Sequence, residues 1–326
     1  MKLLGLSCGS KLGNSEVLLK EALMGAEEVG VAVAIVRLVD LNIRPCKGCK
    51  VCAWRVKGEC ILKDDAPFIQ EQLLECDGLI VSAPVYILTP PGYLKLLSDR
   101  VLNDVSWLME MKKMQQAGGG GFGGALGRRI NIDERAFKNR VGAFISLGGA
   151  STPHWLSFGL PLMHMLTFPR QIEIVDQMQV PGLSLYGNAV MNEKALARAR
   201  KLGRNVAEAM KKPISEVKWM GDDPGTCPVC HSNLLTVGKK NPVECPVCGI
   251  SGTIKVDGDK ITVTFSEKER KRSRLTIAGK LEHWIELREN SKIRMQKGDD
   301  TAEIAKRLKK YESYKTPLKP TRKSRA

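Results

Sequence analysis

Long apolar runs are absent from the sequence, and so is an export signal. No stretch reaches the roughly 18 consecutive apolar residues that suggest a membrane-spanning helix. The N-terminus, Met1 to Gly5, runs straight into a strand-like pattern and lacks the charged, apolar and small-residue segments of a signal peptide. No internal repeat is present either. These absences predict a cytoplasmic protein that does not bind membranes, and its 326 residues predict two or more folding units.

Ten cysteines stand in this chain, and without an export signal they favour metal or redox chemistry over disulfide bonds. Eight of them form two groups of four. The first group is Cys46, Cys49, Cys52 and Cys60, and the second is Cys227, Cys230, Cys245 and Cys248. Cys8 and Cys76 remain, and their apolar, strand-like surroundings favour the role of small buried residues.

Strand-like and helix-like segments alternate over the first part of the chain, a pattern typical of a parallel α/β sheet. We expect strands over Lys2–Ser7, Val31–Val36, Gly78–Ser82, Arg140–Leu147 and Gln171–Val175, the second of them buried. Helices are expected over Ser15–Val29, Pro67–Cys76, from Pro91 onward and over Asn192–Lys211. This succession predicts an α/β fold, a flavodoxin-like doubly wound five-stranded parallel sheet of order 2-1-3-4-5. The glycine-rich segment Gly118–Gly124 has no strand before it, so we expect a flexible flap or linker there.

In such a sheet the ligand lies beyond the carboxyl ends of strands one and three, where the strand order reverses. The first loop there reads Ser7-Cys8-Gly9-Ser10-Lys11-Leu12-Gly13-Asn14-Ser15. Its small residues and the following helix N-terminus can approach a phosphate, although an ordinary N-cap at Asn14 or Ser15 explains the same residues. The later loops favour a ligand, because Pro84-Val85-Tyr86-Ile87 can face a planar ring and Gly148-Gly149 leaves room for it.

These loops, with Lys95, Asp99 and Arg100 on the next helix, resemble the NAD(P)H-dependent FMN reductases over roughly the first 210 residues. The resemblance implies that FMN is bound by Cys8, Ser10, Lys11, Asn14, Ser15, Pro84, Val85, Tyr86, Ile87, Gly148 and Gly149. The arginine that is usual in the family's first loop is replaced by Ser10 or by Lys11. Flavin chemistry requires no acid–base side chain, so no catalytic residue is assigned. His154 could lie near the flavin, whereas we expect His164 to pack in the core.

The first cysteine group has the spacing C-x2-C-x2-C-x7-C, from Cys46 to Cys60. Four thiolates spaced in this way can wrap one cubane cluster, because each must reach a different iron. A structural zinc site is the alternative, but zinc usually takes two CxxC pairs set well apart. The motif resembles that of the iron–sulfur flavoproteins. This resemblance implies a [4Fe-4S] cluster that exchanges electrons with FMN, ferredoxin or NAD(P)H as electron donor, and a homo-oligomer, either a dimer or a tetramer.

The second cysteine group has two CxxC pairs separated by fourteen residues, which is a strong signal for a metal ribbon. Four sulfur ligands suit zinc, and they also suit a single iron. We favour zinc because Gly249 follows the second pair but His231 follows the first, whereas rubredoxin-type iron sites usually have glycine at both positions. A β-hairpin is expected after the ribbon, with strands Thr253–Val256 and Lys260–Phe265 and a turn at Asp257-Gly258.

Positive charge is concentrated at the C-terminal end of the chain. From Glu267 to Ala326 there are 19 Lys and Arg against 9 Asp and Glu, a net charge of +10 out of +16 for the whole chain. We expect amphipathic helices in this tail. Docking of an acidic carrier such as ferredoxin explains the charge; binding of nucleic acid is the less favoured explanation.

Three segments are therefore expected: a flavodoxin-like FMN domain over 1–212 with its iron–sulfur loop at 45–61, a metal ribbon over 213–266, and a basic helical tail over 267–326. The favoured function is an FMN-dependent oxidoreductase that relays electrons between a [4Fe-4S] cluster and the flavin. One alternative is an NAD(P)H-dependent FMN or quinone-type reductase with a structural metal site. The other alternative is a redox-responsive protein that binds nucleic acid or a protein partner.

Overall fold

The computed structural model describes residues 1–49, 51–54, 60–100, 104–117, 131–296, 301–312, 314–315 and 317–318. The chain divides into two compact units, Met1–Leu281 and Glu282–Ala326. The segment Gly118–Gly124, expected as a flap or linker, lies outside the described residues. None of the described helices combines the length and apolarity needed to cross a membrane.

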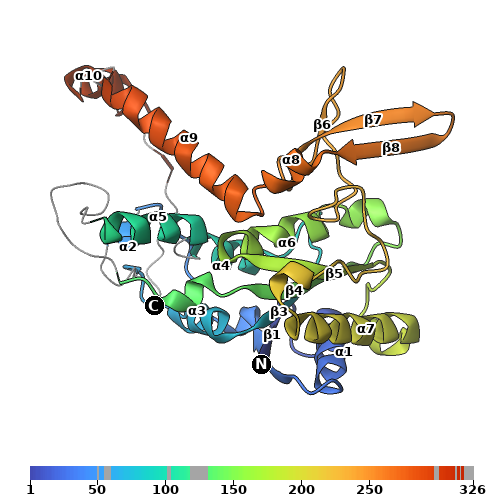
Figure 1. Cartoon of the computed structure of the whole chain (residues 1–326). Coiled ribbons are helices and arrows are strands. Elements are labelled where there is room, and N and C mark those ends of the chain that lie inside the picture. Colours follow the sequence, from blue (N-terminus) through green and yellow to red (C-terminus); the bar gives the residue numbers. More distant parts are fainter. Residues whose placement is uncertain are drawn as a thin grey trace. The chain divides into compact units, whose positions relative to one another are not determined.

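The first unit is built on a five-stranded parallel sheet of order β2-β1-β3-β4-β5 (Figure 1). The strands are β1 (Lys2–Ser7), β2 (Ala32–Arg37), β3 (Gly78–Pro84), β4 (Arg140–Leu147) and β5 (Ile172–Val180). Five strands and their order confirm the flavodoxin-like prediction. The strand order reverses between β1 and β3, which places the predicted ligand loops together at the carboxyl ends of these strands.

Two of the predicted strands differ from the expectation. β2 was expected to be buried, but its residues are half-buried or exposed. The strand order explains this, because β2 is an edge strand with a single neighbour. β5 extends to Val180 and contains a register shift, since Gly142 pairs with Ile174 but Ala143 pairs with Asp176. The residue that is skipped, Val175, therefore forms a β-bulge.

Helices cover both faces of the sheet. α1 (Asn14–Glu27) and α7 (Glu193–Met210) pack side by side on one face. They approach closely because Gly203 has no side chain, and a Cβ there would lie 1.7 Å from the carbonyl oxygen of Ala22. α3 (Ala66–Glu75), α4 (Gly92–Arg100) and α6 (Gly159–Thr167) contribute to the core on the other face.

The remaining helices of the first unit are short or lie outside the sheet layers. They are α2 (Val51–Trp54), α5 (Val105–Gln116), α8 (Glu267–Lys271), and the 3-10 helices η1 (Leu38–Asp40), η2 (Glu134–Phe137), η3 (Pro153–Leu156), η4 (Phe168–Arg170), η5 (Asn188–Met191) and η6 (Ile214–Glu216). α9 (Ile277–Gln296) begins in the first unit, and α10 (Thr301–Glu312) belongs to the second. The expected helical character of the basic tail is thus confirmed for these residues.

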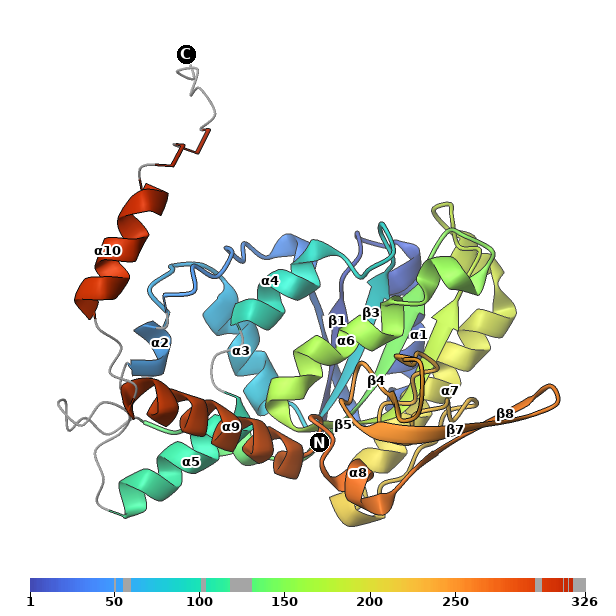
Figure 2. The same ribbon diagram turned by 90° about the horizontal axis from the view of Figure 1, so that it is seen from above.

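A small antiparallel sheet follows α7 in the sequence, with β6 (Val243–Glu244), β7 (Ser251–Asp257) and β8 (Lys260–Phe265). The expected hairpin is confirmed: Asp257 pairs with Lys260, and Gly258 turns the chain at a φ of +57°. Figure 2 shows β7 and β8 as a two-stranded hairpin. At its base Ile250 and Phe265 pack with the four cysteines of the second group in a separate core.

Candidate flavin site and cysteine centres

A cavity of 320 Å³ lies beyond the carboxyl ends of β1, β3 and β4, within the size range of small-molecule sites. All three predicted loops contribute to it. A fourth segment, which the sequence reasoning missed, also lines it. The lining is Gly9, Ser10, Gly13, Asn14, Ser15, Pro84, Val85, Tyr86, Leu147, Gly148, Gly149, Leu183, Ser184, Leu185 and Tyr186.

The loop after β1 is shaped like a cradle for an anionic group. Gly13 is the N-cap of α1, and no side-chain cap hydrogen bond forms there among the described residues. The N–H groups of this turn are therefore available, and the helix dipole adds partial positive charge. A Cβ at Gly9 would lie only 2.0 Å from the Ser15 hydroxyl, so the backbone closes tightly around the loop. These features fit a phosphate.

A buried carboxylate, Glu16, stands in the first turn of the same helix. It pairs with Arg37 and with Lys20, both at 2.7 Å, and accepts a hydrogen bond from the Leu12 N–H at 3.1 Å. The hydrogen bond from Arg37, together with Lys20, holds the pKa of Glu16 at about 2. Since its charge is offset by these two cations, Glu16 can shape the loop without repelling an anion from the helix end.

Asn14 connects the first loop to the missed fourth segment. Its amide donates to the carbonyl oxygens of Leu183 and Leu185, at 3.3 and 2.8 Å, and accepts from the Ala189 N–H at 3.0 Å. The side chain therefore fixes one wall of the cavity against another. The rule that ligands lie beyond the carboxyl ends of strands would have found this wall if β5 had been predicted at its full length.

The loop after β3, which lines the cavity with Pro84, Val85 and Tyr86, makes a tight turn. Tyr86 and Thr89 exchange backbone hydrogen bonds of 2.8 and 3.3 Å. Between them Ile87 and Leu88 have φ values of 49° and 71°. A β-branched residue such as isoleucine rarely adopts this conformation, and strain of this kind is concentrated at functional sites. Val85 donates to the Leu147 carbonyl oxygen at 2.7 Å, which joins this loop to the end of β4.

The first cysteine group lies on the segment between η1 and α3. Cys46 and Cys49 are exposed, while Cys52 and Cys60 are half-buried. Two sulfurs already receive backbone hydrogen bonds: Gly48 donates to Cys46 at 3.4 Å and Leu62 to Cys60 at 3.5 Å. Such N–H groups around sulfur tune the potential of an iron–sulfur cluster. The donor set and these contacts fit the predicted cluster.

A buried ion pair closes the base of this cysteine segment. Asp64 and Arg100 are 0% and 1% exposed, with contacts of 2.5 and 3.0 Å. Asp64 also accepts from the Arg44 N–H at 2.9 Å, and Arg100 donates to the Arg44 carbonyl oxygen at 2.8 Å. The pKa of Arg100 is raised, chiefly by the hydrogen bond to Asp64 and to a smaller degree by Cys60 and Cys46. Arg100, grouped above with the flavin loops, therefore lies behind the cysteines.

The second cysteine group is assembled around one point. The sulfurs of Cys227, Cys230, Cys245 and Cys248 all lie within 4.8 Å of one another and are buried. Two of the separations are 3.6 and 3.4 Å. Zn–S bonds of about 2.3 Å in a tetrahedron place the sulfurs about 3.8 Å apart, so these cysteines fit a single ion. A cubane spreads its ligands over different irons, so this convergence is not expected of the first group.

The residues that follow the two CxxC pairs adopt the same backbone conformation, although only one is glycine. Gly249 has a φ of 71° and His231 a φ of 58°. Each N–H bonds the carbonyl oxygen of the first cysteine of its pair: Gly249 to Cys245 at 2.8 Å, and His231 to Cys227 at 3.0 Å. The His231 ring stacks on Trp219 with centroids 3.6 Å apart. A histidine is thus accommodated at a position that favours glycine.

Comparison with known proteins agrees with this geometry. The family described as NADPH-dependent FMN reductase matches residues 1–177, which include β1, β3, β4 and three of the four segments that line the flavin cavity. The chain belongs to the NADPH-dependent FMN reductase family. It is therefore a flavin-dependent oxidoreductase.

Relatives of this FMN reductase family member carry more specific names. A flavone synthase, cfoJ of Aspergillus candidus, is 36% identical over 279 residues, or 82% of this chain and 83% of that protein. An iron–sulfur flavoprotein of Methanosarcina thermophila is 34% identical over 151 residues, 46% of this chain and 64% of that protein. The solved structure of a flavone reductase has a TM-score of 0.79 and 27% identity, covering 98% of this chain and 100% of that one.

Most of the predicted FMN contacts meet in the cavity of this family member, and three do not line it. Cys8 is buried in the sheet core, where burial raises the pKa of its thiol to about 12. Lys11 and Ile87 lie in the first and second loops but are exposed outside the lining. His164 is buried as expected, edge-on to Phe144. The individual roles of the predicted residues stay predictions.

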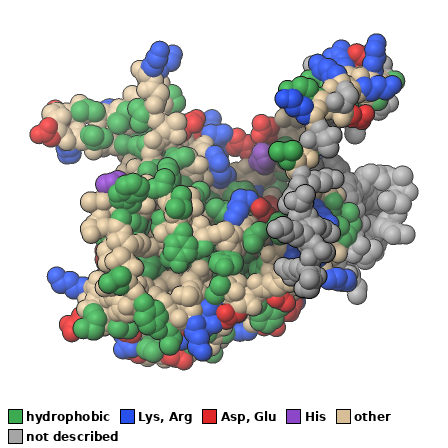
Figure 3. All heavy atoms as spheres, turned by 180° about the vertical axis from the view of Figure 1, so that it is seen from behind, with side chains coloured by type: hydrophobic (Ala, Val, Ile, Leu, Met, Phe, Trp, Pro, Cys, Tyr) green, Lys and Arg blue, Asp and Glu red, His purple; other side chains and the backbone are tan. Residues whose placement is uncertain are grey.

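Exposed apolar side chains line the flavin cavity or adjoin its lining. Tyr86, Leu185 and Tyr186 line it, and Tyr186 is 75% exposed. Ile87, next to Tyr86 in the sequence, is 92% exposed. Figure 3 shows the molecule from behind, with hydrophobic side chains spread between charged ones on this face. Tyr86, Ile87, Leu185 and Tyr186, the apolar rim, make the surroundings of the cavity suitable for aromatic or protein partners.

Proposed function

We propose that the chain binds FMN in the 320 Å³ cavity and acts as an electron-transfer oxidoreductase. The first loop, with Ser10 and Ser15 and the N-terminus of α1, would hold the phosphate. Pro84, Val85 and Tyr86 would face one side of the isoalloxazine, and Gly148 and Gly149 would leave space at the other. FMN supplies the ability to exchange electrons singly or in pairs.

We further propose that Cys46, Cys49, Cys52 and Cys60 hold a [4Fe-4S] cluster that exchanges single electrons with the flavin. The observation that supports this most directly is the closed base of the cysteine segment, where Asp64 and Arg100 tie Arg44 in place two residues before Cys46. Such a preformed base lowers the conformational entropy lost when four thiolates converge on one cluster. The match to an iron–sulfur flavoprotein over 46% of the chain supports the same assignment.

Replacing Cys49 with serine tests this relay. We expect the variant to keep FMN and to lose cluster iron and the electron transfer between a reduced ferredoxin and the flavin, as followed by anaerobic stopped-flow absorbance. Cys76→Ser, a buried cysteine outside both groups, is the matched control and should keep both centres. A Cys49→Ser protein that passes electrons from ferredoxin to FMN at the wild-type rate would contradict the relay.

Our second proposal concerns the substrate of the flavin site. The flavone reductase structure spans nearly this whole chain, and the A. candidus relative is named for flavone synthesis. We propose that this chain transfers two electrons and two protons to the carbon–carbon double bond beside the carbonyl of a planar aromatic ketone, with NAD(P)H or a reduced carrier as the electron donor, which is itself oxidised. Anaerobic incubation with a flavone and NADPH, analysed by mass spectrometry, should give a product heavier by two hydrogens. Unchanged flavone would contradict this proposal.

The other expectations follow from the same features. We propose zinc for the cysteine ribbon, with iron as the alternative, and a division of the chain at 1–212, 213–266 and 267–326. The apolar rim supports a homo-oligomer, a dimer or tetramer, because such surfaces are commonly buried against a second copy. The net charge of the tail supports docking of ferredoxin or another acidic carrier. Cytoplasmic localisation is also proposed.

A further inference from the structure

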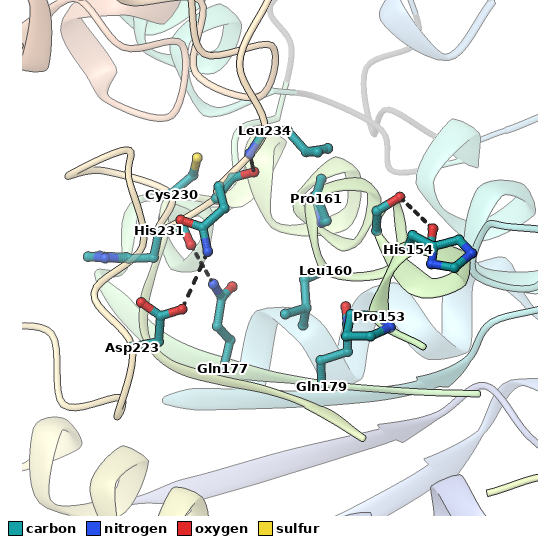
Figure 4. Close-up of a pocket in the computed structure, with 13 residues that line it drawn as sticks. Pro153, His154, Leu160, Pro161, Gln177, Gln179, Asp223, Cys230, His231 and Leu234 are labelled. Atoms are coloured by element: carbon teal, nitrogen blue, oxygen red, sulfur yellow. Dashed lines mark hydrogen bonds between the residues drawn. The ribbon is translucent and has the colours of Figure 1, made fainter. Parts of the chain in front are cut away.

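A second cavity, of 470 Å³, lies between β5, α6 and the loops of the cysteine ribbon (Figure 4). Of the residues that the structure describes, none lines both this cavity and the flavin cavity. Leu160 and Pro161 of α6 form one wall, and the ribbon segment 230–234 forms another. The cavity is thus made by two parts of the chain that are distant in sequence.

The floor of this second cavity is polar for a structural reason. Before the bulge at Val175, Ile172 and Ile174 pack into the core beneath α6. Beyond the bulge, Gln177 and Gln179 line the cavity together with residues of α6, and both are half-buried. Figure 4 shows their amide groups directed into the space. Two amides therefore stand where a packed sheet face normally has apolar side chains.

The two amides differ in what they contact. Gln177 donates through Nε2 to the His231 carbonyl oxygen at 2.9 Å, which ties the sheet to the ribbon. Its Oε1 is shielded within the protein and has no hydrogen-bond partner among the described residues, so a ligand in the cavity does not reach it. Gln179 makes no side-chain hydrogen bond to the described residues, and its half-buried amide lines the cavity. A hydroxyl group can donate to the carbonyl oxygen of this amide.

The charge of the lining restricts the ligand further. Among the described residues that line the cavity there is no lysine or arginine, and Asp223 is the one carboxylate. A phosphate or carboxylate would find no cation here, which disfavours nucleotides and other anions. Leu160, Pro161 and Leu234 offer apolar surface beside the amides. Apolar walls with a few convergent polar groups are typical of sites for uncharged organic molecules.

We propose that this second cavity binds an uncharged, hydroxylated aromatic ring compound, with a phenolic hydroxyl donating to the Gln179 amide oxygen and a ring packed against Leu160 and Pro161. This site goes beyond the proposed flavin chemistry and does not depend on it. It is nevertheless linked to the flavin cavity through one segment, since Gly148 and Gly149 line that cavity, and Pro153 and His154 line this one. The cysteine ribbon thereby contributes a wall to a ligand site.

The test is calorimetric titration of the full-length, FMN-loaded chain with a hydroxylated flavone. Leu160→Trp fills the cavity, and Gln179→Leu removes one amide without removing the contact between Gln177 and the ribbon. Val237→Trp, on a ribbon residue that is 65% exposed and outside the lining, is the matched control. We expect Leu160→Trp and Gln179→Leu each to weaken binding at this site by about tenfold, the effect of roughly one lost hydrogen bond or an equivalent clash.

Two further measurements make the result interpretable. Flavone without hydroxyl groups should be insensitive to Gln179→Leu, because it has no hydroxyl to donate. Flavin absorbance and calorimetric stoichiometry report the flavin cavity separately, so a failure of the flavin proposal is distinguishable. Equal affinity of the wild type, Leu160→Trp and Gln179→Leu would overturn the site, even if the probe binds against the flavin. Absence of any binding to the wild type would overturn it as well.

Discussion

The ion pair of Asp64 and Arg100 permits a prediction that separates stability from cofactor loading. Both side chains are buried, and together they hold Arg44 by its N–H and its carbonyl oxygen. Burial alone would raise the pKa of Asp64, but the hydrogen bonds from Arg100 and from the backbone keep that pKa below its usual value. The pair is therefore charged at neutral pH.

Arg100→Met removes one partner and leaves the Asp64 carboxylate buried without its cation. Breaking a buried pair in this way costs about 3–5 kcal/mol. Replacing both residues with apolar ones of similar size is often close to neutral, so Asp64→Leu combined with Arg100→Met should recover most of this loss. Arg100→Met loses the contact to the Arg44 carbonyl oxygen, and the double variant also loses the contact to the Arg44 N–H, so both should hold the cysteine segment less well and load less iron.

The assay combines urea unfolding with iron and acid-labile sulfide analysis after anaerobic reconstitution. Glu134→Gln is a matched control, because Glu134 pairs with Lys112 at 2.7 Å on the surface, where such pairs contribute about 0–1 kcal/mol. We expect the double variant to unfold near the wild-type urea concentration but to contain clearly less cluster. A double variant that regains both stability and full iron content would refute the role of this pair in holding the segment.

Three further predictions concern other parts of the first unit. Glu16→Gln should lower the free energy of unfolding at neutral pH by about 3 kcal/mol, because folding lowers the pKa of Glu16 from 4.5 to about 2. In urea titrations the difference in stability between the wild type and the variant should vanish as pH falls from 4.5 toward 2. Gly9→Ala should reduce the amount of bound FMN, measured by absorbance, because the added Cβ would lie 2.0 Å from the Ser15 hydroxyl. Gly92→Ala is the control and should keep its FMN, because an added Cβ there would meet no atom within 4 Å. Equal flavin content in the two variants would contradict the phosphate cradle. Cys245→Ser should release the metal of the ribbon and make the ribbon sensitive to limited proteolysis, while the flavin is retained. A digestion pattern identical to that of the wild type would show that the metal does not hold the ribbon together.

Local sequence patterns were enough to predict the main fold, the convergent cysteine group of the ribbon and the hairpin after it. The alternation of strands and helices predicted all five strands and their order, because each buried strand has an apolar run of its own. The CxxC pairs predicted the convergent ribbon site for a similar reason, since each pair is a local turn. The hairpin at Asp257-Gly258 is likewise a local structure.

Features that depend on distant contacts could not be predicted in this way. β2 has the composition of a buried strand, yet its place at the sheet edge exposes it. Arg100 finds Asp64 from 36 residues away, and no periodicity indicates that contact. The segment 183–186 reaches the flavin cavity only because β5 is longer than its apolar residues suggest and because Asn14 holds it there.

Cofactor analysis of one anaerobically purified sample tests the central claim, that a flavin and an iron–sulfur cluster share this chain with a separate zinc ribbon. Flavin, iron, acid-labile sulfide and zinc are quantified per chain in the same preparation. The structure and the cysteine spacing predict about one FMN, about four irons with matching sulfide, and about one zinc. About two zinc ions per chain with no acid-labile sulfide would contradict the claim, since both cysteine groups would then be structural.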